Sequence, residues 1–134
     1  MFTALDPFLR RASRMSLSSY AKDGILTVVF DDARILDETK LEELGTELLE
    51  MLNKTTEERV ILDFRNVKFM SSSMLGKLVQ THKKCGEFKV KMKLCSIDPE
   101  IRQVFKITKL DKLFDIEADE AAARKAFMRK GWFG

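Results

Sequence analysis

The residue types that bind metals and form disulfides are scarce in this sequence. It has two cysteines, Cys85 and Cys95, and one histidine, His82, and neither cysteine stands in a C-x-x-C spacing. Metal sites usually combine several such ligands at short spacing, so the sequence predicts no metal site and no bound cofactor. Two unpaired thiols are typical of a reducing compartment, where they serve as small buried apolar groups. We therefore expect a cytoplasmic protein.

Long apolar runs and flexible linkers are also missing. The 134 residues include two prolines and six glycines, and no low-complexity tract divides the chain. The longest apolar runs, such as Ile25–Phe30, are far shorter than the roughly 20 residues of a membrane-spanning helix. Residues 1–14 lack the basic-then-apolar order of a secretory signal. The sequence predicts an N-terminal extension over 1–14 and a single domain over 15–130, without a membrane partner.

A strong excess of one charge is absent as well. The chain has 24 basic and 21 acidic residues, which gives a net charge of +3, and 45% of its residues are hydrophobic. Domains that bind nucleic acids usually carry a much stronger basic bias, so nucleic acid is not an expected partner. The hydrophobic fraction suffices for one globular domain with its own core.

Strand and helix patterns alternate along the chain. Asp23-Gly24 between strand-like segments at 17–21 and 25–30 is typical of a hairpin. Further strand patterns occupy Val60–Phe64, Phe88–Cys95 and Leu113–Ile116, and helix patterns follow Asp37 or Thr39, the serines 71–73, Asp98 and Asp119. This order predicts an α/β fold with a mixed, largely parallel sheet of four to five strands and helices packed against it.

Two local features refine that prediction. Gly86 stands in the usual place for a glycine that ends a helix. Lysines alternate with apolar residues over Phe88–Cys95, which predicts a strand with one solvent-facing side or a protected edge. In the helix after Asp98-Pro99, we expect Ile101, Val104 and Phe105 to form the apolar side.

The segment Val60–Gly76, VILDFRNVKFMSSSMLG, resembles the central signature of bacterial anti-sigma factor antagonists, which are STAS domains. That signature is an apolar strand ending in Asp, a short link, and Phe-Met-Asp-Ser-Ser-Gly-Leu-Gly at a helix start. The matching residues are Asp63, Phe69, Met70, Ser72, Ser73, Leu75 and Gly76. Residues 94–105 are also similar to the family, and the resemblance covers roughly 17–127.

The resemblance implies a regulatory protein–protein interaction module that is not an enzyme. The implied partner is an anti-sigma factor or a protein with a histidine-kinase-like ATPase domain. In the family, phosphorylation of the second serine, here Ser73, abolishes binding, and a PP2C-type phosphatase reverses it. The expected contact surface consists of Lys68, Phe69, Met70, Ser71, Ser72, Ser73, Met74 and Lys77.

Two departures from the family pattern leave alternatives open. Ser71 replaces the aspartate before the serine pair, and Met74 replaces the glycine after it. The alternative is a non-phosphorylated STAS scaffold, a homodimer included, or a module that binds a small ligand or anion. Ser72 could simply cap the helix. Met74 could pack in the core or adapt to a partner's surface.

Two other polar positions need an interpretation. His82 and Cys85 lie one helical turn apart, but no third catalytic group or oxyanion motif accompanies them, so we expect them to pack in the core or at its boundary. Asp63 ends a central strand, where it could line a ligand crevice, cap the adjacent loop or orient the serine segment.

Overall fold

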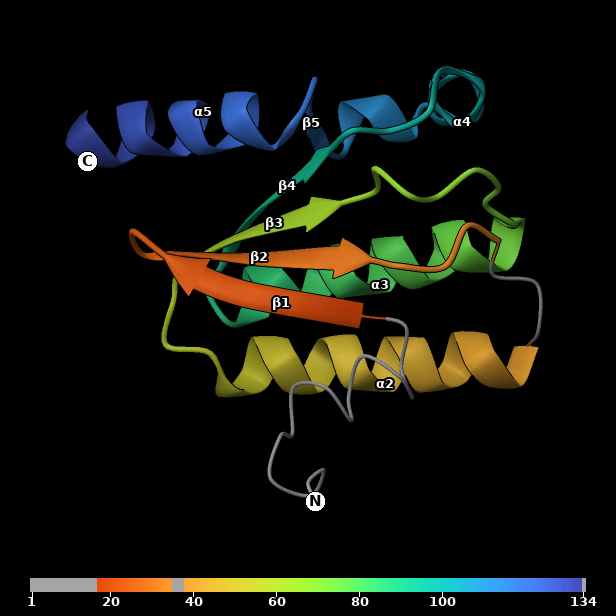
Figure 1. Ribbon diagram of the computed structural model, residues 1–134, viewed down its shortest axis with the longest axis horizontal. Helices are drawn as coiled ribbons and strands as arrows, with labels where there is room; N and C mark the ends of the chain where they lie inside the picture. The colour runs from red at the N-terminus through yellow and green to blue at the C-terminus, as the bar shows by residue number, and fades with distance from the viewer. Residues whose placement is uncertain (1–16, 35–37, 134) are drawn as a thin grey trace.

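The computed structural model describes residues 17–34 and 38–133, and the side chains of Glu38 and of residues 130–133 are not described. The expected extension over 1–14 and the candidate cap Asp37 lie outside the described residues. The elements, in chain order, are β1 Leu17–Lys22, β2 Ile25–Phe30, α2 Glu38–Lys54, β3 Arg59–Asp63, α3 Ser72–Glu87, β4 Lys91–Cys95, α4 Pro99–Ile107, the 3-10 turn η2 Leu110–Lys112, β5 Asp115–Glu117 and α5 Glu120–Phe133 (Figure 1).

The five strands form one mixed sheet in the order β1-β2-β3-β4-β5. β1 and β2 are antiparallel and are joined by the predicted turn, in which Asp23 and Gly24 have φ angles of 57° and 76°. All later strand pairs are parallel, because a helix or a helical segment returns the chain between them. The predicted α/β fold with a largely parallel sheet is confirmed.

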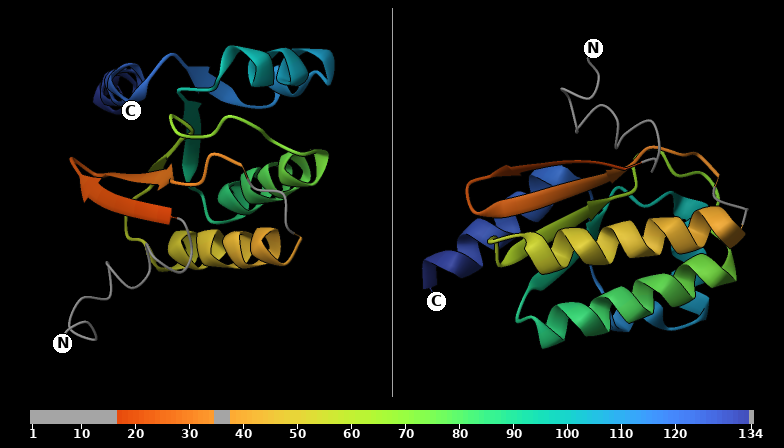
Figure 2. Two further views of the ribbon diagram at one scale, coloured as in Figure 1. Left: turned by 45° about the vertical axis from the view of Figure 1, so that its right-hand side comes forward. Right: turned by 90° about the horizontal axis from the view of Figure 1, so that it is seen from below.

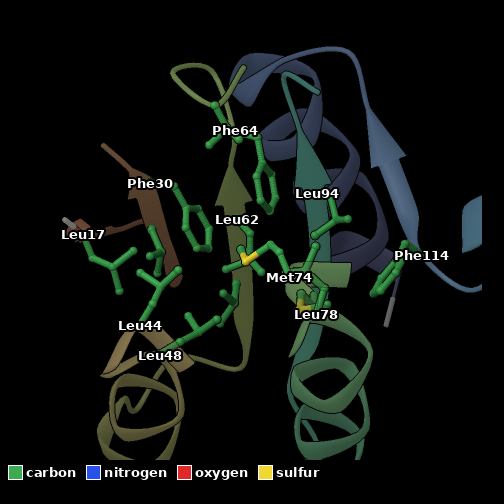
Figure 3. Close-up of a cluster of buried hydrophobic side chains, with 14 of the residues drawn as sticks. Leu17, Phe30, Leu44, Leu48, Leu62, Phe64, Met74, Leu78, Leu94 and Phe114 are labelled. Atoms are coloured by element: carbon green, nitrogen blue, oxygen red, sulfur yellow. The ribbon is translucent and has the colours of Figure 1, made fainter. Parts of the chain in front are cut away.

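The larger core lies between one face of the sheet and the helices α2 and α3, which run side by side beneath it (Figure 2). The leucine stripe of α2 contributes Leu44 and Leu48, and α3 contributes Met74 and Leu78 (Figure 3). The strands contribute residues of alternating positions, because successive side chains of a strand point to opposite faces. The rings of Phe30 and Phe64 stack with their centroids 4.6 Å apart.

A smaller core occupies the opposite face, which α5 covers (Figure 1). Its members are Ile25, Ile61, Cys95, Ala123 and Phe127, all at most 2% exposed. The predicted cap of α5 is confirmed, since the Ala122 amide donates to Oδ1 of Asp119 at 2.8 Å. Both faces of the central strands are therefore buried, as their nearly continuous apolar sequences predict.

The prediction of a solvent-facing side on the strand of residues 88–95 is wrong. β4 begins only at Lys91, and it lies between β3 and β5. The side chain of Lys93 is only 4% exposed, and its Nζ lies 3.6 Å from Asp115 and 3.2 Å from Glu117. It also lies 5.3 Å from the ring centroid of Phe127, because α5 covers this face.

Three further details of the helices differ from expectation. α3 continues through Gly86 to Glu87, and the left-handed residue beyond it is Lys89, with φ 61°. Thr39 lies inside α2 and not at its cap. The Asp98 cap and the Pro99 start of α4 are confirmed, but Val104 is 39% exposed while Ile101 and Phe105 are buried.

Candidate functional site

The chain between β3 and α3 is held in place by the loop that follows β2. The amides of Lys68 and Phe69 both donate to the carbonyl of Ala33, at 2.8 and 3.2 Å. Arg34 and Phe69 form an isolated parallel bridge, which extends the pairing of β2 and β3 beyond their ends. Val67 is 1% exposed and anchors the segment in the core. The site thus lies at the carboxyl ends of two parallel strands.

The helix start that follows is capped by Ser71. Its backbone is extended, with φ −79° and ψ 166°, and its hydroxyl accepts from the Met74 amide at 3.1 Å. This is the usual geometry of a helix N-cap, in which a side-chain oxygen satisfies one of the exposed first-turn amides. The interpretation of Ser72 as the cap is therefore wrong, and Ser72 is the first residue of α3.

Most of the predicted contact residues are brought together on one accessible surface. Lys68, Phe69, Ser72 and Ser73 are exposed, and Met70, Ser71 and Lys77 are half-buried. We call these seven residues the serine surface. No acidic residue lies in the first turn of α3, so the turn itself places no carboxylate at the positive end of the helix dipole.

Met74 does not belong to the serine surface. Its side chain is 2% exposed and belongs to the core between α3 and the sheet (Figure 3). The core alternative is therefore the correct one, and the expected partner contact of Met74 is wrong. Its position four residues before Leu78 on the buried stripe of α3 explains this placement.

Sequence reasoning missed two residues beside the serine surface. The guanidinium carbon of Arg34 lies 5.5 Å from the ring centroid of Phe69, within the range of a cation–π contact. Glu42 of α2 lies 3.0 Å from Nζ of Lys77. Gly45 allows this approach, because a Cβ there would lie 3.3 Å from Cδ of Lys77. Neither residue carries a local sequence signal, since both reach the site through tertiary packing.

Asp63 caps the turn after β3. Its Oδ1 accepts from the Arg65 amide at 2.9 Å, and its Oδ2 accepts from Nε of the same residue at 3.0 Å. The hydrogen bond to Asp63 raises the pKa of the Arg65 guanidinium. Of the alternatives for Asp63, the loop cap is the one whose hydrogen bonds the structure records.

The His82–Cys85 pair lacks the features of an activated nucleophile. Burial raises the pKa of the Cys85 thiol to about 11, so the thiol stays protonated at neutral pH. Its recorded contact is with the sulfur of Met92 at 3.8 Å. The His82 ring packs edge-on against Phe114, with centroids 5.4 Å apart. Cys85 packs in the core and the half-buried His82 lies at its boundary, as expected.

Residues 17–34 and 38–133 contain no group of three or more histidine, cysteine, aspartate or glutamate side chains that could hold a metal ion. No helix in these ranges combines the length and apolar character needed to cross a membrane.

Comparison with known proteins identifies the family. A model of the STAS domain matches residues 16–123. The chain is 27% identical over 113 residues to BtrV of Bordetella bronchiseptica, which is named as an anti-sigma factor antagonist; the match covers 84% of this chain and 95% of that protein.

Solved structures share the fold. An anti-sigma factor antagonist (STAS) domain protein of Planctomyces limnophilus superimposes with a TM-score of 0.72 at 23% identity, over 82% of this chain and 96% of the other. The Bacillus cell fate determinant SpoIIAA in its phosphorylated form gives a TM-score of 0.61 at 16% identity, and the match covers 82% of this chain and 98% of SpoIIAA. The matched family model shows that the chain belongs to the STAS domain family, and the sequence match to BtrV relates it to anti-sigma factor antagonists.

Proposed function

We propose that this protein is a cytoplasmic regulatory module that binds another protein through the serine surface and catalyses no reaction itself. The proposed partner is an anti-sigma factor or another protein with a histidine-kinase-like ATPase domain. The proposed switch is phosphorylation of Ser73 by such a partner, reversed by a PP2C-type phosphatase. The observation that carries the proposal is the exposed pair Ser72 and Ser73 in the first turn of a helix already capped by Ser71.

The position of Ser73 suits a switch that leaves the fold intact. A phosphoryl group adds about −1.5 to −2 charges at neutral pH. The first turn of a helix tolerates this charge, because its amides and the dipole favour anions. A partner surface shaped for neutral serines would have to desolvate the charge without a counter-ion, which weakens the complex.

The cap also explains how the site can work without the family's aspartate. Ser71 supplies the hydrogen bond to the Met74 amide that keeps the helix start ordered. The side chain of Ser71 is neutral, so a phosphate on Ser73 would meet no carboxylate in this turn. Ser73 can therefore act as the acceptor while Ser71 keeps the structural role.

Intact-mass measurement after incubation with ATP and a purified candidate kinase tests the switch. The proposal expects a mass increase of about one phosphoryl group in the wild type and in Ser72→Ala, and no increase in Ser73→Ala. Modification of Ser73→Ala to the same extent as the wild type would overturn Ser73 as the acceptor.

Binding of the purified partner tests the surface independently of the kinase reaction. Ser73→Asp, Lys68→Glu and Phe69→Ala are expected to weaken binding, because each changes the charge or apolar area of the serine surface. Lys125→Glu on the exposed side of α5 is the matched control and should bind as the wild type does. Equal binding by all variants would show that the partner contacts another surface.

A second function follows from the charge of the same site. Lys68 and Arg34 are exposed near a helix start that has no acidic residue in its first turn, an arrangement that suits a bound anion. In that case the protein is a non-phosphorylated scaffold that binds a small anionic ligand. A rise in melting temperature with inorganic phosphate or a nucleotide, lost in Lys68→Glu, would support this function over the first.

A further inference from the structure

Exposed apolar side chains gather on α4 and the η2 turn that follows it. Val104, Ile107 and Leu113 are 39%, 77% and 41% exposed, and no other ten-residue stretch of the described chain has three such residues. Single exposed apolar residues are ordinary on protein surfaces, whereas a group of them indicates an interaction surface. We call these three residues the α4 surface.

Positive charge surrounds the α4 surface. Arg102, Lys106, Lys109 and Lys112 are all exposed, and Asp111 is the one carboxylate between the first and the last of them. None of the four cations forms an ion pair with another described residue. A complementary surface would therefore combine an apolar hollow with unpaired carboxylates.

Such a surface exists on the same chain. A hollow of ≈ 360 Å³ lies between α2 and the end of α3, and its apolar lining includes Leu49 and Phe88, the latter 40% exposed. Glu50 and Lys84 line it as well, and the amino group of Lys84 is already paired with Glu87 at 3.4 Å. Glu43 lies two turns before Glu50 on the same side of α2. Neither carboxylate forms an ion pair within the described residues. We call this feature the α2 hollow.

We propose that the α4 surface of one chain docks into the α2 hollow of a second copy. Ile107 enters the hollow between Leu49 and Phe88, and Lys106 and Lys109 face Glu43 and Glu50. α4 and α2 lie on opposite sides of the molecule, so one chain can use both surfaces at once (Figures 1 and 2). The contact is heterologous, so successive copies add head to tail.

The apolar and the ionic parts of the proposed contact respond differently to added salt. Burial of Ile107 supplies the apolar part of the association, which added salt leaves in place. The lysine–glutamate pairs form at the exposed rim, so added salt weakens them. The proposal therefore expects association that rises with protein concentration and decreases, without vanishing, as salt is added.

Sedimentation velocity over a concentration series tests the proposal with four single variants. Ile107→Asp removes the α4 surface and Glu50→Lys places a positive charge in the α2 hollow. Each is expected to weaken self-association by about tenfold or more, because each puts an unpaired charge in the contact. Met128→Asp on α5 and Glu58→Lys after α2 are the matched controls, and they should associate as the wild type does.

A mixture of the two disabled variants distinguishes this contact from any symmetric dimer. Ile107→Asp keeps an intact α2 hollow, and Glu50→Lys keeps an intact α4 surface, so the mixture should form a species of two chains that cannot grow further. A wild type that stays monomeric at every concentration overturns the proposal. The proposal is also overturned if Ile107→Asp and Glu50→Lys associate like the wild type, or if their mixture forms no pair. Circular dichroism spectra equal to the wild type's confirm that the exposed substitutions leave the fold intact.

Discussion

Asp63 is fully buried, although it carries a charge that water would otherwise solvate. Its carboxylate is compensated by the Arg65 amide and guanidinium, and Arg65 also reaches Glu120 of α5 at 3.0 Å. Asp63 thus fixes the turn that leads from β3 toward the serine surface. Arg65 links that turn to the last helix. A buried charge is tolerated only with such partners.

We predict that Asp63→Ala lowers the free energy of unfolding by about 1.5–3 kcal/mol, because the part-buried Arg65 amide loses a charged acceptor. Chemical denaturation measures the change. Asp119→Ala, which removes an exposed helix cap on α5, is the comparison and should cost about 1 kcal/mol. An Asp63→Ala variant as stable as the wild type would show that water replaces the carboxylate at no cost.

The two thiols are protonated in the folded protein over the whole neutral range. Burial raises the pKa of Cys85 to about 11 and that of Cys95 to about 12, and the nearby Asp63 carboxylate adds to the second shift. In the unfolded chain, both thiols ionise at about pH 8.5. Their contribution to stability is therefore complete below that pH and decreases above it, as the unfolded state ionises first.

We predict that the free energy of unfolding falls more steeply between about pH 8 and pH 10 in the wild type than in Cys85→Ala/Cys95→Ala. Denaturation curves over this range measure the two slopes. Other groups titrate equally in both proteins, so the difference belongs to the thiols. Identical slopes would contradict the raised pKa values.

At the scale of elements, α3 separates a structural serine from exposed ones. Ser71 caps the helix, whereas Ser72 and Ser73 lie on its exposed first turn. We predict that Ser71→Ala lowers the free energy of unfolding by about 1 kcal/mol, since the Met74 amide loses its acceptor. Thermal or chemical denaturation of the three serine-to-alanine variants measures this. A larger loss in Ser73→Ala than in Ser71→Ala would reverse the assignment.

The sequence predicts most elements because their signals are local. The leucine stripe that includes Leu44 and Leu48 defines α2, and the Asp23-Gly24 turn defines the hairpin. The error at Lys93 arises from a distant element, since α5 covers it and the carboxylates of Asp115 and Glu117 follow in β5. The alternation of lysines with apolar residues does not indicate whether a distant helix packs over the lysine side of the strand.

In the candidate site too, the sequence predicts the contiguous residues and misses those that distant elements contribute. The serine triplet and the link before it could be found from the sequence, because they are contiguous. The assignment of the cap to Ser71 depends on backbone angles, and three adjacent serines are equivalent in composition. Arg34 and Glu42 join the site through the pairing of β2 with β3 and the packing of α2 on α3, which no single-segment pattern encodes.

At the scale of the whole molecule, the sheet separates two cores of unequal size. The larger one lies under α2 and α3 and includes Cys85, and the smaller one lies under α5 and includes Cys95. Polar contacts also hold α5 against β1, since Tyr20 donates to Glu120 and Arg124 donates to the Lys22 carbonyl at 2.9 Å. The two thiols therefore report separately on the two faces.

We predict that Phe127→Ala lowers the free energy of unfolding by about 3–5 kcal/mol, because it removes the largest side chain of the smaller core. Alkylation under native conditions, followed by peptide mass analysis, should show a greater increase in the labelling rate of Cys95 than of Cys85. Met128→Ala, at an exposed position of α5, is the control and should stay within about 0.5 kcal/mol of the wild type. Equal acceleration of both thiols would mean that α5 does not open on its own.

The separate cover of the second face has a consequence for synthesis on the ribosome. All five strands precede α5 in the chain, and domains begin to fold as the nascent chain emerges. Until residues 120–133 have been translated and released, Ile25 and Ile61 have no covering helix, although the opposite face is already complete. A stalled or prematurely terminated product would thus present an apolar β-sheet face to chaperones and proteases.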